Sequence, residues 1–174
     1  MTTTIVIWGA GRIGRGFVAD LFADAGYQLV FVDQADALIE NLRQAGCYTV
    51  VHAASETQRE DRVIKDFTAL ATAQANEIAA AVAQAGLIAT AVFPKDFPTV
   101  AQQLIPGLLQ RRAANPDAPL DIILCTNLAH AAPEFRAPLL AGPCRRAPAP
   151  GLRRAWASSR VSSSAWWPIR LLKS

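Results

Sequence analysis

One stretch, from Thr3 to Asp33, constrains the fold of this 174-residue chain more than any other. An apolar run rich in β-branched residues leads into three glycines, Gly9, Gly11 and Gly14, and apolar residues at helical spacing follow them. A second apolar run ends at Asp33, nineteen residues after Gly14. This order of strand, glycine turn, helix and acid-ended strand is typical of the first βαβ unit of a dinucleotide-binding domain.

The glycine turn gives each residue type a physical role. Gly9 lets the chain turn sharply off the strand, Gly11 lets a diphosphate approach the backbone, and Gly14 allows helix and strand to pack closely. The free N–H groups and the dipole at the start of the helix favour an anion, and Arg12 and Arg15 would add positive charge. The turn contributes six predicted cofactor-binding residues: Gly9, Ala10, Gly11, Arg12, Ile13 and Gly14.

Asp33 predicts which cofactor the site prefers. A carboxylate at the end of the second strand accepts hydrogen bonds from the adenosine ribose hydroxyls and repels a 2′-phosphate. No arginine occurs in the four residues that follow it, Gln34 to Ala37. The sequence therefore predicts NAD as the cofactor rather than NADP.

Composition excludes several other classes of protein. With 52% hydrophobic residues the chain has ample material for one core, yet no apolar run approaches the ~18 residues of a membrane span. No basic region precedes the first strand, so we expect a cytoplasmic protein without a membrane partner. The three cysteines lack CxxC spacing and the two histidines lie far apart, which indicates neither disulfides nor a metal site.

Strands and helices alternate after Asp33. We expect helices at residues 35–45, 74–84, 99–112 (with a possible kink at Pro106) and from 129, and strands at 48–53, 62–70, 87–92 and 120–126. The strands at 48–53 and 62–70 could also form an extra hairpin. The pattern predicts an α/β fold over residues 1–140: a Rossmann-type doubly wound, mostly parallel sheet.

Ligands of such sheets bind at the carboxyl ends of the strands, which directs attention to Val92, Phe93 and Asn127. Val92 and Phe93 are predicted to form an apolar wall against the cofactor, with a place in the core as the alternative for Phe93. The Asn127 carboxamide has two interpretations. It donates to a substrate oxyanion or the nicotinamide amide, or it closes a turn and caps the next helix.

Residues 6 to about 140 resemble the N-terminal domain of the long-chain polyol (mannitol) dehydrogenase family. The matching stretches are WGAGRIGRGFVADLFADAGYQLVFVD, GCYTVVHAASETQREDRV, LIATAVFPKDFPTVAQQL and DIILCTNLAHAAPEF. The resemblance implies an NAD-dependent oxidoreductase that converts a sugar alcohol or its phosphate, with mannitol 1-phosphate to fructose 6-phosphate as the best match. It also implies that Asn127, in a Cys-x-Asn motif, helps to hold the reacting oxygen.

The chain departs from this family in one important respect. The family uses a lysine as general base, in a Lys-x4-Asn-x2-His motif on a helical C-terminal domain. Here Lys65, Lys95 and Lys173 are the only lysines, and none is followed five residues later by Asn. We therefore expect the catalytic domain to be absent and the chain alone to be inactive. The alternative is an NAD-binding module or fragment without catalytic activity.

The last part of the sequence differs from the rest. Residues 135–174 hold no acid and 8 of the 17 bases, and we interpret residues 141–174 as an irregular basic tail. A frameshift near residue 141 would explain it, because serine codons read one nucleotide earlier encode apolar residues. The alternative is a genuine basic extension that binds nucleic acid or an anionic membrane. Interspersed proline and serine favour the frameshift, so no nucleic acid partner is predicted; the oligomeric state is left open.

Overall fold

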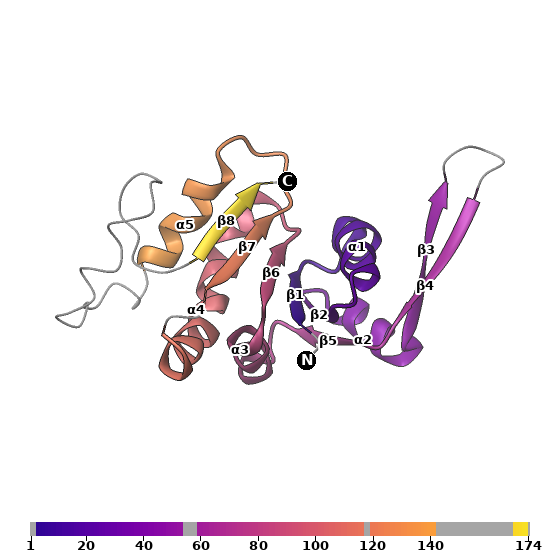
Figure 1. The fold of residues 1–174 in the computed structure, drawn as a ribbon, viewed down its shortest axis with the longest axis horizontal. Helices are drawn as coiled ribbons and strands as arrows, with labels where there is room; N and C mark the ends of the chain where they lie inside the picture. Colours follow the sequence, from indigo (N-terminus) through magenta and orange to yellow (C-terminus); the bar gives the residue numbers. More distant parts are fainter. Residues whose placement is uncertain (1–2, 54–58, 117–118, 142–168, 174) are drawn as a thin grey trace.

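The computed structural model describes residues 3–53, 59–116, 119–141 and 169–173. Its main element is a six-stranded sheet with the strand order β5-β2-β1-β6-β7-β8, in which every neighbouring pair is parallel. The six strands are β1 Thr4–Trp8, β2 Gln28–Asp33, β5 Phe67–Ala71, β6 Leu87–Thr90, β7 Leu120–Leu124 and β8 Ile169–Lys173. The first strand of the chain thus lies in the middle of the sheet, between β2 and β6 (Figure 1).

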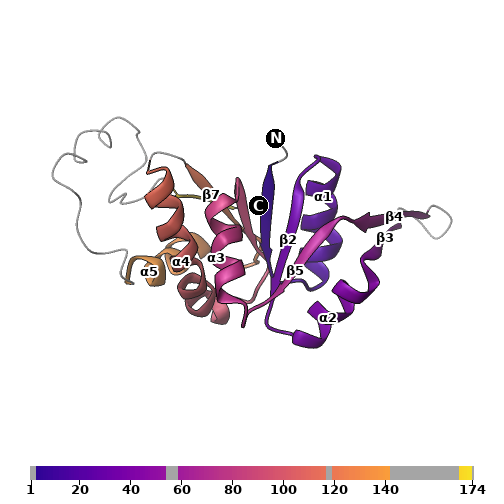
Figure 2. The same ribbon diagram turned by 90° about the horizontal axis from the view of Figure 1, so that it is seen from below.

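Helices cover both faces of this sheet (Figures 1 and 2). The helical segments are η1 Gly14–Val18, α1 Ala19–Asp24, α2 Asp36–Ala45, α3 Ala75–Gln84, η2 Pro94–Asp96, α4 Phe97–Ala114 and α5 Ala131–Ala141. Ile5 and Ile7 of β1 point into a core shared with α1 and α2, whereas Val6 and Trp8 point into a core shared with α3, α4 and α5. This alternation confirms the predicted doubly wound fold.

The predicted strand at residues 62–70 is wrong as a single element. Asp66 adopts a left-handed backbone conformation (φ 60°) and separates β4, Arg59–Lys65, from β5. Aspartate tolerates this conformation better than most residues, so the chain can turn here without glycine. β4 pairs antiparallel with β3, Cys47–Ala53, in a hairpin that projects from the sheet (Figure 1), which confirms the hairpin arrangement.

The helix after the glycine turn begins with a π-helical turn, η1, and continues as α1. Its apolar residues have the predicted spacing but do not all face the core. Val18 is buried, whereas Ile13, Phe17 and Leu21 are 53%, 63% and 55% exposed. A π turn takes up more residues per turn than an α-helix, so residues on either side of it do not keep a single α-helical face. The helix thus carries a second, solvent-facing apolar stripe.

The region interpreted as an irregular basic tail, residues 141–174, contains a regular element among its last residues. Ile169–Lys173 forms β8, which pairs with β7 from Leu120↔Ile169 to Leu124↔Lys173. The outer edge of β7 offers unpaired backbone groups, and a short segment can pair there whatever its side-chain periodicity. Residues 142–168, where the frameshift is predicted, lie outside the described residues.

The predicted helix at residues 99–112 is longer at both ends, because α4 begins at Phe97 and runs through Pro106 without a break to Ala114.

Within the described residues, no helix is both long and apolar enough to cross a membrane.

Candidate cofactor site

A cleft of about 430 Å³ opens at the carboxyl ends of β1, β2, β5 and β6. This volume falls within the range of about 300–1,000 Å³ that is usual for small-molecule sites. Its lining residues come from the glycine turn, the strand ends and the start of α4: Trp8, Gly9, Gly11, Asp33, Gln34, Thr72, Ala91, Val92, Phe93, Asp96, Thr99, Val100 and Gln103. The cleft therefore lies where the topology of the sheet predicts a ligand.

Backbone geometry explains two of the three glycines. Gly9 has φ 95°, and a Cβ placed on it would lie 2.5 Å from the Ala91 carbonyl oxygen. A Cβ on Gly14 would lie 1.8 Å from the Gly9 carbonyl oxygen, so the helix can approach the turn only without a side chain there. Gly11 differs, because no protein atom lies within 4 Å of its Cβ position. The space beside Gly11 is therefore open, and Gly11 is one of the residues that line the cleft.

Asp33 is held in place by the backbone on both sides of it. The Ala10 N–H donates to Oδ2 over 2.7 Å, and the Ala35 N–H donates to Oδ1 over 2.9 Å. A carboxylate has about four lone-pair positions, so each oxygen keeps capacity for another donor. The carboxylate that ends β2 is therefore fixed at the glycine turn and can still accept from a ligand.

The other predicted residues of the turn have different surroundings. Ala10 is buried, while Arg12 and Ile13 are exposed and do not line the cleft. Arg15, which was expected to add positive charge, donates through Nε to the Ala10 carbonyl oxygen over 2.6 Å. Its guanidinium carbon lies 5.7 Å from the centre of the Tyr48 ring. Arg15 thus braces the turn from outside the cleft.

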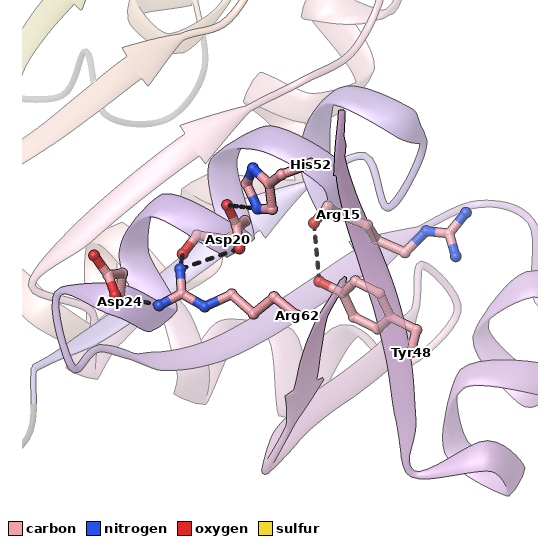
Figure 3. A network of polar contacts seen from close by, with 6 residues as sticks. All are labelled: Arg15, Asp20, Asp24, Tyr48, His52 and Arg62. Carbon is pink, nitrogen blue, oxygen red and sulfur yellow. Dashed lines mark hydrogen bonds and ion pairs between the residues drawn. The ribbon is translucent and has the colours of Figure 1, made fainter. Parts of the chain in front are cut away.

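Figure 3 shows a polar network that the sequence analysis missed and that attaches the hairpin to η1 and α1. The Tyr48 hydroxyl donates to the Arg15 carbonyl oxygen over 3.0 Å, and burial raises the pKa of Tyr48, so it remains a donor. His52 Nε2 lies 3.0 Å from Asp20 Oδ2, and Arg62 Nη1 lies 3.2 Å from Asp20 Oδ1. The available signal was Asp20, an acid placed among the apolar residues of the first helix.

Arg62 spans two acids of α1, since it also pairs with Asp24. Hydrogen bonds to Asp24 and then to Asp20 raise the pKa of Arg62, which keeps the guanidinium charged. Asp20 is only 7% exposed, and burying a charged side chain costs free energy unless the charge is paired. The helix that leaves the glycine turn is therefore supported by the sheet on one side and by the hairpin on another.

The loops after β6 and β7 hold the remaining predicted residues. Val92 and Phe93 line the cleft, and Phe93 is 72% exposed, so its alternative placement in the core is wrong. Asn127 is exposed and does not line the cleft. The predicted helix from residue 129 begins at Ala131, and within the described residues the Asn127 side chain makes no hydrogen bond to it. Asn127 thus lies too far from the helix start to cap it, while its role in holding an oxygen stays a prediction.

Two further observations concern reactive groups. Burial raises the pKa of Cys125, at the end of β7, which keeps this thiol protonated. Among the residues that the structure describes, no three His, Cys, Asp or Glu side chains gather in a way that could hold a metal ion.

Comparison with known proteins identifies the family. The family model for the mannitol dehydrogenase Rossmann domain matches residues 3–165, beyond the domain boundary predicted at residue 140. Among solved structures, yersinopine dehydrogenase in its apo form matches with a TM-score of 0.52 and 18% identity. That match covers 71% of this chain and 28% of the other chain, and at this identity it supports the fold alone.

Curated relatives agree with the family model. The mannitol-1-phosphate 5-dehydrogenase of Anoxybacillus flavithermus is 39% identical over 124 residues, which are 71% of this chain and 31% of the relative. The enzyme of the same name from Enterococcus faecalis is 34% identical over 124 residues, 71% of this chain and 32% of the relative. The chain thus spans about a third of the length of these relatives. On the strength of the family match, the chain belongs to the mannitol dehydrogenase family, through its Rossmann domain.

Proposed function

We propose that the chain binds NAD in the cleft at the glycine turn and is the cofactor-binding part of a polyol-phosphate dehydrogenase. The observation that carries this proposal is that Gly11, whose Cβ position is open, lines the same cleft as Asp33. A side chain there would meet no protein atom, so the absence of a side chain makes sense when a ligand approaches the backbone. The adjoining helix start offers N–H groups to a diphosphate.

Different residues around the cleft would contact different parts of the cofactor. Asp33 accepts hydrogen bonds from the ribose hydroxyls, and Val92 and Phe93 provide apolar surface. Gly9 and Gly14 keep the turn in the shape that leaves Gly11 open. When bound, NAD supplies a nicotinamide ring that takes or gives a hydride.

Charge in the cleft favours NAD over NADP. None of the described residues that line the cleft is Lys or Arg, and Asp33 and Asp96 both carry negative charge. A 2′-phosphate at the ribose would lie beside the Asp33 carboxylate and be repelled by its charge. NAD, which has a free 2′-hydroxyl, gives Asp33 a donor instead.

The substrate of the whole protein is inferred from the relatives, whose name specifies mannitol 1-phosphate. In the proposed reaction a hydride passes from the substrate carbon to the cofactor, and the alcohol proton passes to a base. No lysine in this chain lies in the Lys-x4-Asn-x2-His pattern, and Asn127 is the proposed residue for holding the reacting oxygen. We therefore expect this chain to bind cofactor without turnover.

Titration of the 174-residue chain with NADH and NADPH tests the proposal. NADH should bind more tightly than NADPH. Asp33→Asn should lower the affinity for NADH and reduce the ratio between the NADH and NADPH affinities. The expected loss is on the order of 1–3 kcal/mol, the value of hydrogen bonds to a charged acceptor. Asp36→Asn is the matched control, because Asp36 is a nearby acid that does not line the cleft. Equal NADH and NADPH affinities in the unmodified chain would contradict the proposed preference.

A further inference from the structure

The cleft has a wall that lies beyond both the glycine turn and Asp33. It is built by the β6–α4 connection and the first turns of α4, which supply Phe93, Asp96, Thr99, Val100 and Gln103. Phe93 is exposed and Val100 is buried, so the wall combines apolar surface with three polar side chains. Apolar surface with a few placed polar groups is the usual composition of a small-molecule site.

Asp96 is the unusual member of this wall. It occupies the N-cap position of α4, where an aspartate normally accepts a hydrogen bond from the second or third residue of the helix. Here it makes no such bond: its backbone is αR (φ −91°), and Pro98, near the helix start, has no N–H. Within the described part of the chain the Asp96 carboxylate accepts no hydrogen bond, although it is half-buried. Its acceptors remain available to the cleft.

The position of the wall determines which part of a dinucleotide it would contact, if the proposed NAD binding holds. With the diphosphate above Gly11 and a ribose at Asp33, the adenine attached to that ribose extends into the rest of the cleft. Gln34 and Thr72, which follow β2 and β5, line the same cleft, and no residue after β7 does. The cleft therefore belongs to the adenosine half of the cofactor.

We propose that Asp96 recognises the 6-amino group of adenine, with Gln103 beside it and Phe93 against the face of the ring. Adenine donates two hydrogens from its 6-amino group, and a carboxylate only accepts. Hypoxanthine has an oxygen at the same position, which would face the Asp96 carboxylate without a hydrogen between them. Gln103 does not discriminate in this way, because its amide can rotate to present either a donor or an acceptor.

The experiment compares NADH with reduced nicotinamide hypoxanthine dinucleotide, whose base carries an oxygen in place of the 6-amino group and a hydrogen on the neighbouring N1. Both are titrated into the 174-residue chain, and binding is followed by the fluorescence of the reduced nicotinamide. We expect NADH to bind on the order of tenfold more tightly, the value of one hydrogen bond to a charged group. Asp96→Asn, whose amide can rotate, should reduce that ratio to about twofold or less. Gln103→Leu should lower the affinities for both compounds by similar factors.

Three outcomes separate this inference from the proposed function. If neither compound binds, NAD binding itself is wrong and the inference falls with it. If both bind equally to the unmodified chain, NAD binding holds and adenine recognition by Asp96 is wrong, a result that needs no variant. If Asp96→Asn keeps the full preference, another residue recognises the base. Asp36→Asn, an acid outside the cleft, should leave the ratio unchanged, and circular dichroism checks that each variant is folded.

Discussion

Two regions at the carboxyl ends of the strands differ in how firmly their residues are fixed. On the turn side, formed by the glycine turn and Asp33, the chain is held by close contacts such as the 2.7 Å bond from Ala10 to Asp33. On the loop side, formed by the residues after β7, Asn127 is exposed and does not line the cleft. The difference shows that the domain by itself fixes the region around the glycine turn. Its described residues do not fix the loop after β7 in the same way.

The largest expected effect is a loss of stability caused by a substitution on the turn side. Gly14→Ala places a Cβ 1.8 Å from the Gly9 carbonyl oxygen, and backbone on both sides leaves little room to relax. We expect the free energy of unfolding to fall by about 3 kcal/mol or more, at the upper end for overpacking. Gly16→Ala is the matched control, because nothing lies within 4 Å of its Cβ position. Urea unfolding should show Gly16→Ala at least as stable as the unmodified chain; equal midpoints for both variants would contradict the comparison.

A second variant separates binding from folding on the same side. Gly11→Val points a branched side chain into open space, so the chain should fold with an unchanged circular dichroism spectrum. The side chain would occupy the proposed diphosphate position, and NADH affinity should fall at least tenfold, or about 1.4 kcal/mol. Fluorescence titration measures this loss. NADH binding that survives the substitution would mean that the turn is only structural.

The smallest effect is expected on the loop side. Asn127→Ala removes an exposed side chain that does not line the cleft. The free energy of unfolding should change by less than about 0.5 kcal/mol, as for most surface substitutions. NADH affinity should stay within about twofold. A large loss of either quantity would show that the loop side is organised by this chain after all.

The sequence was sufficient to predict the parts of the fold that depend on local pattern. Strand, glycine turn and acid-ended strand could be located because glycine, β-branched residues and Asp33 have strong positional preferences. The break at Asp66 could not be predicted, because nothing in the sequence distinguishes an aspartate with a left-handed backbone from another polar residue within a strand. β8 was missed for another reason: its pairing partner, β7, is distant in sequence, and the free edge of that strand decides the outcome.

The candidate site divides in the same way. Gly9, Gly11, Asp33, Val92 and Phe93 were predicted from the sequence and line one cleft. Thr99 and Gln103 were not predicted as lining residues, because their place on the cleft depends on how α4 lies against the sheet. The network of Asp20, His52 and Arg62 was also missed, since it joins a helix to a hairpin more than thirty positions away.

The central position of β1 has a consequence for the synthesis of the protein. Ile5 is made almost first, yet one of its two neighbouring strands contains its partner Leu87. At about 5–20 residues per second, roughly 4 to 16 s pass before the ribosome has added that partner. Throughout this interval one edge of an apolar strand is unpaired. A ribosome that pauses before Leu87 would therefore prolong the period in which the nascent chain is most prone to aggregate.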